Sequence, residues 1–345
     1  MPVSCPNPAE SAVPSCGVLM VNLGTPSAPD APALRAYLAE FLADRRVVDL
    51  PRVLWYPILY GVILPFRAPR SAALYRRIWT PQGSPLRVFS QALADAMGSH
   101  LSGRARVGLA MRYGQPSVAA QMRALRDAGV QRMLVLPMYP QYSVTTTASV
   151  MDAVQAEMAT WPRPAELRMV NDYHDDAAWI GVVADKIREH RARQAVPGHL
   201  LFSFHGIPQR CVDKGDPYAR QCHASARAIA GALGLGEGEW SLSFQSRLGK
   251  AKWLMPYTDQ TVRELARRGI RHLDVVCPGF AVDCLETLEE IAIQNAEFFH
   301  EAGGESLRYV PALNADVAHV EALTTLIERH AGDWLVTPTA DATRV

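Results

Sequence analysis

Residues 199–208 read HLLFSFHGIP, an uninterrupted apolar run that ends in a histidine and a glycine. A run without apolar/polar alternation is typical of a strand that is buried on both faces of a parallel sheet. Similar runs recur along the chain and therefore predict several such strands. They are GVLMVNLGTP from Gly17, RVGLAMRYG from Arg106, RMLVLPMYPQYS from Arg132, WSLSFQSR from Trp240 and LDVVCPGF from Leu273.

Helical patterns lie between these runs. Residues 30–43 place apolar side chains at spacings of three and four, residues 117–128 follow Ser117 as a suitable N-cap, and residues 260–268 precede Gly269 as a suitable stop. Alternating strands and helices indicate a parallel sheet with helices on both faces. Because the pattern occurs twice, the sequence predicts an α/β protein with two Rossmann-like, doubly wound domains.

The pattern changes near WPRPAELR, residues 161–168, and a chain of 345 residues is long enough for about two domains. We therefore expect an N-terminal domain over residues 16–165 and a C-terminal domain over residues 166–330. Residues 1–15 are rich in proline and lack the basic and apolar segments of a secretory signal, so they predict a disordered extension. Residues 331–345 are expected to form a C-terminal tail.

Composition excludes several kinds of partner. The formal net charge is +1, which argues against a general nucleic-acid binder, since such proteins carry a basic field or stripe. The chain has neither a GxGxxG fingerprint nor a P-loop, so a nucleotide or dinucleotide enzyme is disfavoured. Its six cysteines form no CxxC pair and are too sparse for a disulfide scaffold, which predicts reduced thiols in the cytoplasm.

Residues 53–66, VLWYPILYGVILPF, are apolar and carry no charge. A helix that spans a bilayer needs about 20 apolar residues, and Pro57 and Gly61 would interrupt this one. Two interpretations remain open. The segment is either a buried helix pair or an exposed apolar lip that meets a greasy ligand or a membrane surface.

Ligands of doubly wound sheets bind beyond the carboxyl ends of the strands, and His205 follows directly after the strand-like LLFSF. A neutral imidazole there would serve as a metal ligand or as a proton acceptor near pH 7. In the predicted helix after CPGF, Glu286, Glu290 and Gln294 fall at intervals of four and share one face, with Glu289 to one side. This stripe is either a solvated face or a path of hard ligands for a divalent cation.

These residues also carry a resemblance. SFHGIP at 203–208, together with CPGFAVDCLETLEEI at 277–291, resembles the signature pair of the ferrochelatase family, and the overall pattern is most similar to its proteobacterial branch. The resemblance extends over residues 16–330 and implies a chelatase-like fold, with an active-site cleft between the two domains. Further matching blocks are NLGTP at 22–26, DRRVVD at 44–49, LYRRIW at 74–79, GSPL at 83–86, YPQYS at 139–143, FQSR at 244–247 and WLMPYTD at 253–259.

The resemblance implies insertion of Fe2+ into protoporphyrin IX, with release of two protons and formation of protohaem, the last step of haem biosynthesis. His205 and Glu286 match the family's metal and proton-transfer pair, and Glu290 continues the acidic path. Residues that match porphyrin contacts or aromatic pocket walls are the expected substrate-binding set. They are Arg67, Tyr75, Ser84, Trp253 and Phe280, with Tyr113 added because it follows the strand at 106.

Two departures limit what is carried over. Some relatives have a histidine two residues before the glutamate, where this chain has Cys284, and some continue the acidic stripe where it has Gln294. Relatives that hold a [2Fe–2S] cluster use cysteines near the carboxyl terminus, whereas Cys284 is the last cysteine here. We therefore expect no iron–sulfur cluster and no tightly bound cofactor, with Fe2+ as a substrate.

The expected partners are protoporphyrin IX and Fe2+, with no nucleic acid. The expected location is the cytoplasm, with peripheral membrane contact through residues 53–66. Two alternatives remain open at this point. One is a chelatase that acts on coproporphyrin or another tetrapyrrole, including cobalt insertion into a corrin precursor. The other is a non-catalytic tetrapyrrole carrier, which would not need both His205 and Glu286.

Overall fold

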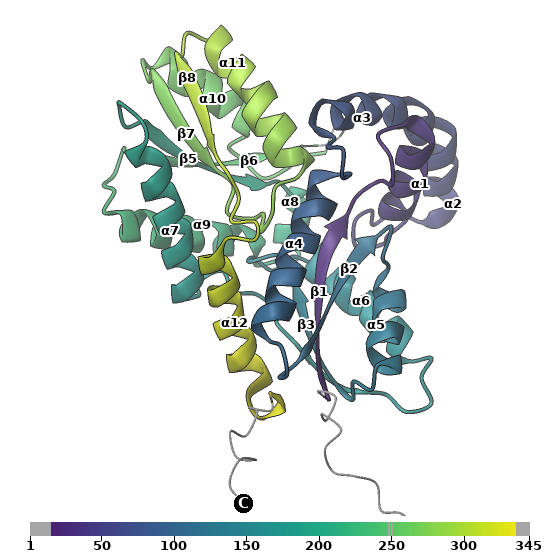
Figure 1. The fold of residues 1–345 in the computed structure, drawn as a ribbon. Coiled ribbons are helices and arrows are strands. Elements are labelled where there is room, and N and C mark those ends of the chain that lie inside the picture. Colours follow the sequence, from purple (N-terminus) through teal and green to yellow (C-terminus); the bar gives the residue numbers. More distant parts are fainter. Residues whose placement is uncertain (1–14, 248, 250, 336–345) are drawn as a thin grey trace, which may run out of the picture.

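The computed structural model describes residues 15–247, 249 and 251–335, and it contains two four-stranded parallel sheets (Figure 1). The strand orders are β2-β1-β3-β4 and β6-β5-β7-β8, so the two sheets share one topology. The six apolar runs form β1–β3 and β5–β7, which confirms the predicted α/β fold. The strands are β1 (Cys16–Gly24), β2 (Arg106–Tyr113), β3 (Arg132–Pro137), β4 (Glu166–Met169), β5 (His199–His205), β6 (Trp240–Gln245), β7 (His272–Val276) and β8 (Ser306–Val310).

Helices connect the strands, and three of them coincide with the helical patterns of the sequence. The helices of the first half are α1 (Ala31–Leu42), α2 (Arg52–Ile58), η1 (Leu59–Ile63), α3 (Leu64–Ile78), α4 (Pro85–His100), α5 (Val118–Asp127) and α6 (Thr147–Met158). Those of the second half are α7 (Ala177–Ala192), α8 (Gln209–Asp213), α9 (Tyr218–Leu233), α10 (Thr258–Arg267), η2 (Glu286–Asn295), α11 (Ala296–Glu301), α12 (Val317–Ala331) and η3 (Gly332–Trp334). The expected N-cap is present, because Ser117 Oγ accepts a hydrogen bond from Ala120 N at 3.2 Å.

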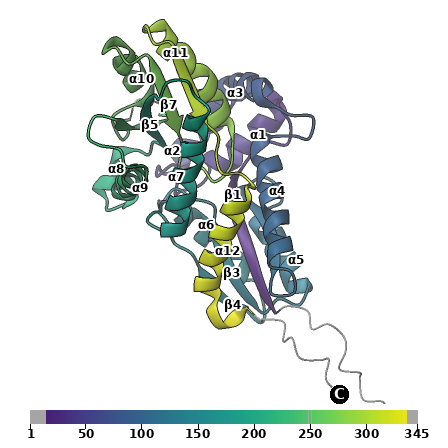
Figure 2. The ribbon, with the colours of Figure 1, turned by 60° about the vertical axis from the view of Figure 1, so that its left-hand side comes forward.

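Each sheet is covered by helices on both faces. One apolar cluster packs α5 and α6 against the first sheet, and another packs α10, η2 and α11 against the second. The remaining faces share a single large cluster, to which α4, α7, α9 and α12 all contribute. Helix α12 contacts α7 and β3, while α7 contacts α9 and β8, so these two helices connect the two halves (Figures 1 and 2). The two halves are therefore joined by a common core rather than by a linker.

This shared core changes the expected domain limits. The boundary was predicted between residues 165 and 166, but β4 lies beyond that point and pairs with β3 in the first sheet. Near the other end of the chain, α12 contacts α4, β3 and β4 of the first half as well as α7 of the second, so it packs against both halves. The expected tail also begins too early, because Trp334 is 4% exposed and lies under the Arg168 guanidinium at 4.0 Å. The predicted extension over residues 1–15 and the rest of the tail lie almost entirely outside the described residues.

The NLGTP stretch places a glycine where two strands come closest. Gly24 pairs with Tyr113 across β1 and β2 and has a φ of +113°. A Cβ atom at this position would lie 1.8 Å from the carbonyl oxygen of Tyr113. Only glycine allows this approach, which brings the residues after β1 close to the carboxyl end of β2.

Residues 53–66, here called the lip, form α2, η1 and the start of α3. Leu59 and Leu64 are buried, but Val53 is 85% exposed and Phe66 is 64% exposed. Other large apolar side chains along the lip are also exposed, so a buried helix pair is the wrong interpretation for most of it. Among the described residues, no helix is long and apolar enough to cross a membrane. Gly61 does not interrupt the helical path, because it lies inside the π-helical turn η1.

Candidate active site

A cavity of about 510 Å³ opens between the two halves of the molecule. Its wall combines side chains of α1, α3 and the loop after β3 with side chains that follow β5, β6 and β7. Cavities of this size hold small organic ligands. The location agrees with the expected cleft beyond the carboxyl ends of the strands.

His205 reaches this cavity as the last residue of β5. Its Nδ1 lies 2.6 Å from the carbonyl oxygen of Gly206, and its ring centroid lies 6.4 Å from that of Phe280. A Cβ atom at Gly206 would lie 2.9 Å from the carbonyl oxygen of Gln245, so the turn after His205 needs a residue without a side chain. The imidazole is therefore held at the carboxyl edge of the second sheet.

The acidic residues reach the same cavity from η2, which is a π-helix rather than the α-helix assumed from the sequence. A π-helix is bonded between residues five apart, and such turns occur often at functional sites. Glu286, Glu290 and Gln294 line the cavity as expected. Glu289, which the α-helical spacing placed to one side, lines it as well.

Glu290 is fixed by the loop after β6. Ser246 donates to its carboxylate from both the backbone N–H, at 2.7 Å, and the hydroxyl. Ser246 has a φ of +64°, an uncommon conformation for a residue with a side chain, and it directs both donors at this carboxylate. Burial raises the pKa of Glu290, while the hydrogen bonds from Ser246 and the nearby charge of His205 oppose this shift.

The start of η2 is held by Asp283, a residue that the sequence analysis did not single out. Asp283 is 4% exposed and accepts hydrogen bonds from Thr287 Oγ1 at 2.9 Å, Tyr309 Oη at 2.6 Å and Asn314 Nδ2 at 2.8 Å. Gln245 Nε2 also donates to the backbone carbonyl of Glu286 at 2.9 Å. These bonds set the direction in which the first turn of η2 enters the cavity.

Four of the six expected substrate contacts line the cavity, namely Arg67, Tyr75, Trp253 and Phe280. Arg67 has no hydrogen-bond or ion-pair partner among the described residues, and burial lowers its pKa. A cation in this condition is suited to bind an anionic group of a ligand. Tyr75 is 7% exposed, and burial raises its pKa above the ordinary value of a tyrosine.

The other two expected contacts do not line the cavity. Ser84 is 3% exposed, and its hydroxyl lies 2.7 Å from that of Thr25. Tyr113 is 1% exposed and donates to Asp44 Oδ2 at 2.8 Å. Both residues support the wall from behind, which their position near strand ends and near matching motifs did not reveal.

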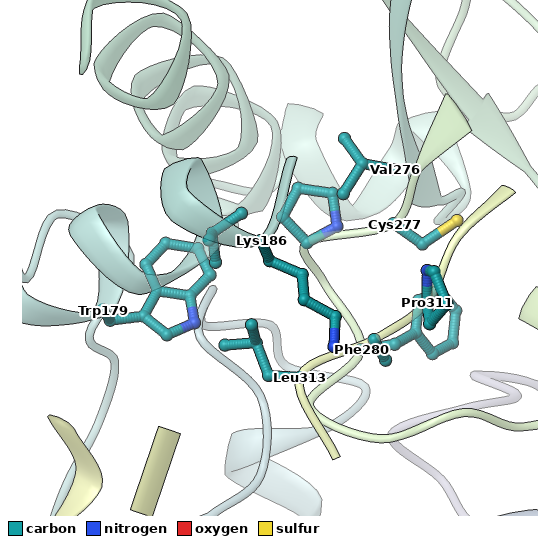
Figure 3. Close-up of a pocket in the computed structure, with 10 residues that line it drawn as sticks. Trp179, Lys186, Val276, Cys277, Phe280, Pro311 and Leu313 are labelled. Atoms are coloured by element: carbon teal, nitrogen blue, oxygen red, sulfur yellow. The ribbon is translucent and has the colours of Figure 1, made fainter. Parts of the chain in front are cut away.

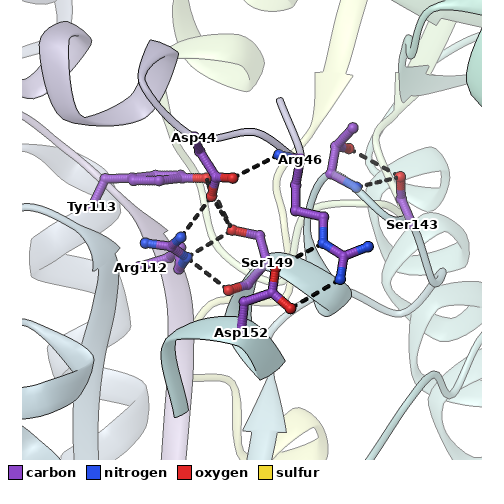
Figure 4. Close-up of polar contacts among 8 residues, drawn as sticks. Asp44, Arg46, Arg112, Tyr113, Ser143, Ser149 and Asp152 are labelled. Carbon is purple, nitrogen blue, oxygen red and sulfur yellow. Dashed lines mark hydrogen bonds and ion pairs between the residues drawn. The ribbon is translucent and has the colours of Figure 1, made fainter. Parts of the chain in front are cut away.

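Asp44 lies in the loop that precedes the lip, and its carboxylate connects this loop to the first sheet. Arg112 and Ser149 donate to the same carboxylate oxygen as Tyr113, each at 2.6 Å (Figure 4). Burial opposes ionisation of Asp44, but the hydrogen bonds from Ser149, Arg46 and Tyr113 bring its pKa below the ordinary value. Arg46 also pairs with Asp152 on α6, so two carboxylates anchor this end of the loop.

The loop after β3 supplies cavity residues that were quoted only as part of the YPQYS motif. Gln141, Ser143, Thr145 and Thr146 all line the cavity. Ser143 donates to Asp216 Oδ2 at 2.9 Å, which ties this loop to the second half of the chain. The motif match at residues 139–143 gave no reason to choose individual side chains.

Phe280 separates the main cavity from a second one of about 20 Å³, a space that holds about one water molecule (Figure 3). Trp179, Lys186 and Leu313 line this smaller cavity on its other sides. Lys186 Nζ lies 2.6 Å from Asp316 Oδ2. The aromatic wall of the main site is thus one residue thick at Phe280.

The main cavity does not contain a preassembled metal cage. Among the described residues, Asp172, His174 and Asp175 form the one group of three or more potential ligands whose ligand atoms lie within 4.8 Å of one another, and none of these residues lines the cavity. His205 and the carboxylates of η2 are more widely spaced.

Comparison with known proteins agrees with this geometry. The family model described as Ferrochelatase matches residues 15–331. A ferrochelatase of Methylococcus capsulatus is 53% identical over 313 residues, which cover 90% of this chain and 95% of the relative. A ferrochelatase of Edwardsiella ictaluri is 52% identical over 311 residues, or 90% of this chain and 97% of the relative.

Solved structures share the fold at much lower identity. SirB from Bacillus subtilis with Fe3+ has a TM-score of 0.54 at 12% identity, covering 92% of this chain and 96% of that chain. The sirohydrochlorin chelatase SirB from Bacillus subtilis subspecies spizizenii, in complex with cobalt, has a TM-score of 0.55 at 9% identity, covering 92% and 97%. The fold is thus shared with these two structures, and the sequence matches extend over most of each ferrochelatase. The chain belongs to the ferrochelatase family, whose members are metal-inserting lyases of haem biosynthesis.

Proposed function

We propose that this chain inserts Fe2+ into protoporphyrin IX, with release of two protons and formation of protohaem. The observation that carries the proposal is the meeting of His205, from β5, with the carboxylates of η2 at one cavity large enough for an organic ring. A carrier of tetrapyrroles would need the apolar wall and Arg67, but it would not need a proton acceptor and an acidic path together.

The reaction needs a way to remove two protons from the pyrrole nitrogens. A neutral imidazole accepts protons near pH 7, so His205 takes the role of acceptor. Glu286 and Glu290 continue from it along η2 and support proton exit or the approach of the metal. Glu290 accepts hydrogen bonds from Ser246, which keeps this carboxylate oriented while charge moves past it.

The cavity wall performs the second part of the work. A planar porphyrin presents no accessible lone pair to an ion above the ring, so the macrocycle must bend. Tyr75, Trp253 and Phe280 are the aromatic walls that would clamp it, at a strain of about 1–5 kcal/mol drawn from binding energy. Arg67, which lacks a partner among the described residues, pairs with a propionate through its planar guanidinium.

Substrate choice tests this proposal most simply. Initial rates with Fe2+ under anaerobic conditions should be clearly higher with protoporphyrin than with coproporphyrin. Two cavity arginines, Arg67 and Arg210, have no hydrogen-bond or ion-pair partner among the described residues, which suits a ring with two carboxylates. The two rates are compared by haem absorbance at equal porphyrin concentration. A large preference for coproporphyrin would replace protoporphyrin as the substrate, and an absence of metal insertion with either ring would leave the carrier function.

We further propose that the protein works in the cytoplasm without a resident cofactor and touches a membrane through the lip. Val53, Leu54 and Phe66 expose large apolar surfaces, and Phe66 directly precedes Arg67, which lines the cavity. The transfer of apolar patches of this kind from water into the headgroup region is favourable. A greasy ring would then pass between the bilayer and the cavity without crossing water.

The lip predicts a specific loss of vesicle binding. Replacing Val53, Leu54 and Phe66 together by serine should lower partitioning onto phospholipid vesicles by about tenfold or more, since even one large apolar side chain contributes about 1.5–3 kcal/mol when buried. Co-sedimentation with vesicles measures the change. Val317→Ser is the matched control, because Val317 is 73% exposed but lies on α12, away from the lip. Equal partitioning of the triple variant and the control would contradict lip-mediated contact.

A further inference from the structure

An ion pair joins α3 to η2 at the edge of the acidic stripe. Arg77 Nη1 lies 2.7 Å from Glu289 Oε1, and Arg77 Nη2 lies 3.2 Å from Glu297 Oε1. The Glu289 side chain is 2% exposed, whereas that of Glu297 is 58% exposed. The contact with Glu289 therefore takes place away from water, and the contact with Glu297 is largely solvated.

The two partners come from two neighbouring elements of the cavity wall, α3 and η2. Arg77 lies in the last turn of α3, the helix that also carries Arg67 and Tyr75 on the cavity wall. Glu289 lies on η2 between Glu286 and Glu290, and all three carboxylates line the cavity.

Without Arg77, Glu289 would be a buried carboxylate with no hydrogen-bond donor among the described residues. Burial raises the pKa of Glu289, and the charge and hydrogen bond of Arg77 oppose that shift. Breaking a buried pair by removing one partner is costly, because it leaves an uncompensated charge. At a pH where Glu289 is still ionised, the same loss would add one negative charge to the field inside a cavity that is sheltered from solvent.

We propose that Arg77 sets the charge that the acidic stripe presents to the incoming cation, by neutralising Glu289 and leaving Glu286 and Glu290 as the acting carboxylates. Arg77 is a positioning residue in this role, since it touches neither substrate. The inference rests on the proposed metal insertion. A stripe with three free carboxylates would hold Fe2+ more tightly than a delivery site should, whereas two allow the ion to move on.

The two partners should have opposite effects on the use of Fe2+. Arg77→Gln leaves Glu289 unbalanced and is expected to lower the KM for Fe2+ by about three- to tenfold. Glu289→Gln leaves Arg77 unbalanced and is expected to raise that KM by a similar factor. The double variant Arg77→Gln/Glu289→Gln should return the KM to within about twofold of the wild type, because the field is again balanced. The KM for porphyrin should stay nearly constant throughout.

Three variants serve as controls. Arg77→Lys keeps the charge and should leave the KM for Fe2+ close to the wild-type value. Arg76→Gln removes a neighbouring exposed arginine from the same helical turn and should change neither KM. Glu297→Gln removes the solvated partner and should have little effect. Thermal unfolding of each variant reports separately on stability.

The alternative is a purely structural clamp between α3 and η2. A clamp is lost in both single variants and in the double variant alike, so all three would show similar losses of stability and of porphyrin binding. That result, or KM values for Fe2+ that move in the same direction in both single variants, would overturn the role of Arg77. The wild type is measured in the same assay. Absence of metal insertion there would instead remove the proposed function itself.

Discussion

Replacing His205 by alanine is expected to reduce the rate of metal insertion about 10²–10⁴-fold, the usual contribution of a positioned acid or base. The change removes the proton acceptor at the end of β5 but leaves the cavity walls in place. Binding of protoporphyrin should therefore persist, with a dissociation constant within a few fold of the wild-type value. Anaerobic initial rates with Fe2+ and quenching of protein fluorescence by porphyrin measure the two quantities.

His100→Ala is the matched control for this variant. His100 is an exposed histidine in the last turn of α4, and its side chain has no hydrogen-bond partner among the described residues. The control should turn over at the wild-type rate. If His205→Ala turned over as fast as the control, His205 would be a structural histidine and the assignment would fail.

Replacing Glu286 by glutamine is expected to lower the rate about 10–100-fold while the protein stays folded. The substitution keeps the shape of the side chain, and the hydrogen bond from Gln245 Nε2 to the backbone carbonyl of residue 286 does not depend on it. Only the charge beside His205 and Glu290 is lost. The rate is measured as for His205, with the melting temperature as a check on folding.

Glu301→Gln serves as the control for Glu286→Gln. Glu301 is an exposed carboxylate at the end of α11, close in sequence to η2 but outside the cavity. We expect no change in rate for this control. A Glu286→Gln variant with a normal rate and a lowered melting temperature would mean that the acidic stripe is a solvated face of the helix.

The arrangement of the sheets followed from the sequence because fully buried parallel strands have a distinctive pattern. Six apolar runs without alternation became six of the eight strands, and the residues after them became the cavity edge. β4 and β8 were not anticipated. The sequence of β4, ELRM, has partly exposed and charged side chains that suit the edge of a sheet, and the boundary at residue 165 was misplaced for that reason.

The spacing of residues in the sequence could not predict that η2 is a π-helix. The interval of four residues from Glu286 to Glu290 fits an α-helix, so nothing in the sequence placed Glu289 on the cavity wall. The hydrogen bonds that define the site come from residues distant in the chain, as Arg77 to Glu289 and Tyr309 to Asp283 illustrate. Tertiary contacts of this kind leave no local pattern.

Two further errors have the same origin. Tyr113 follows an apolar run and therefore qualified as a pocket residue, yet its hydroxyl points to Asp44 behind the wall. Trp334 lies in a stretch without strong helical periodicity, yet it packs beneath Arg168 in the shared core. In both cases a side chain from elsewhere in the chain decides the environment, and its identity is known only once the chain is folded.

Metal insertion is assigned to the cavity between the two halves. Its most direct test is a single turnover in which protein preloaded with protoporphyrin is mixed with Fe2+ under anaerobic conditions and followed by absorbance. The wild type should convert bound porphyrin to haem far faster than free porphyrin takes up iron. Porphyrin that stays bound and metal-free, or that gains iron only at the rate of the free ring, would contradict the account.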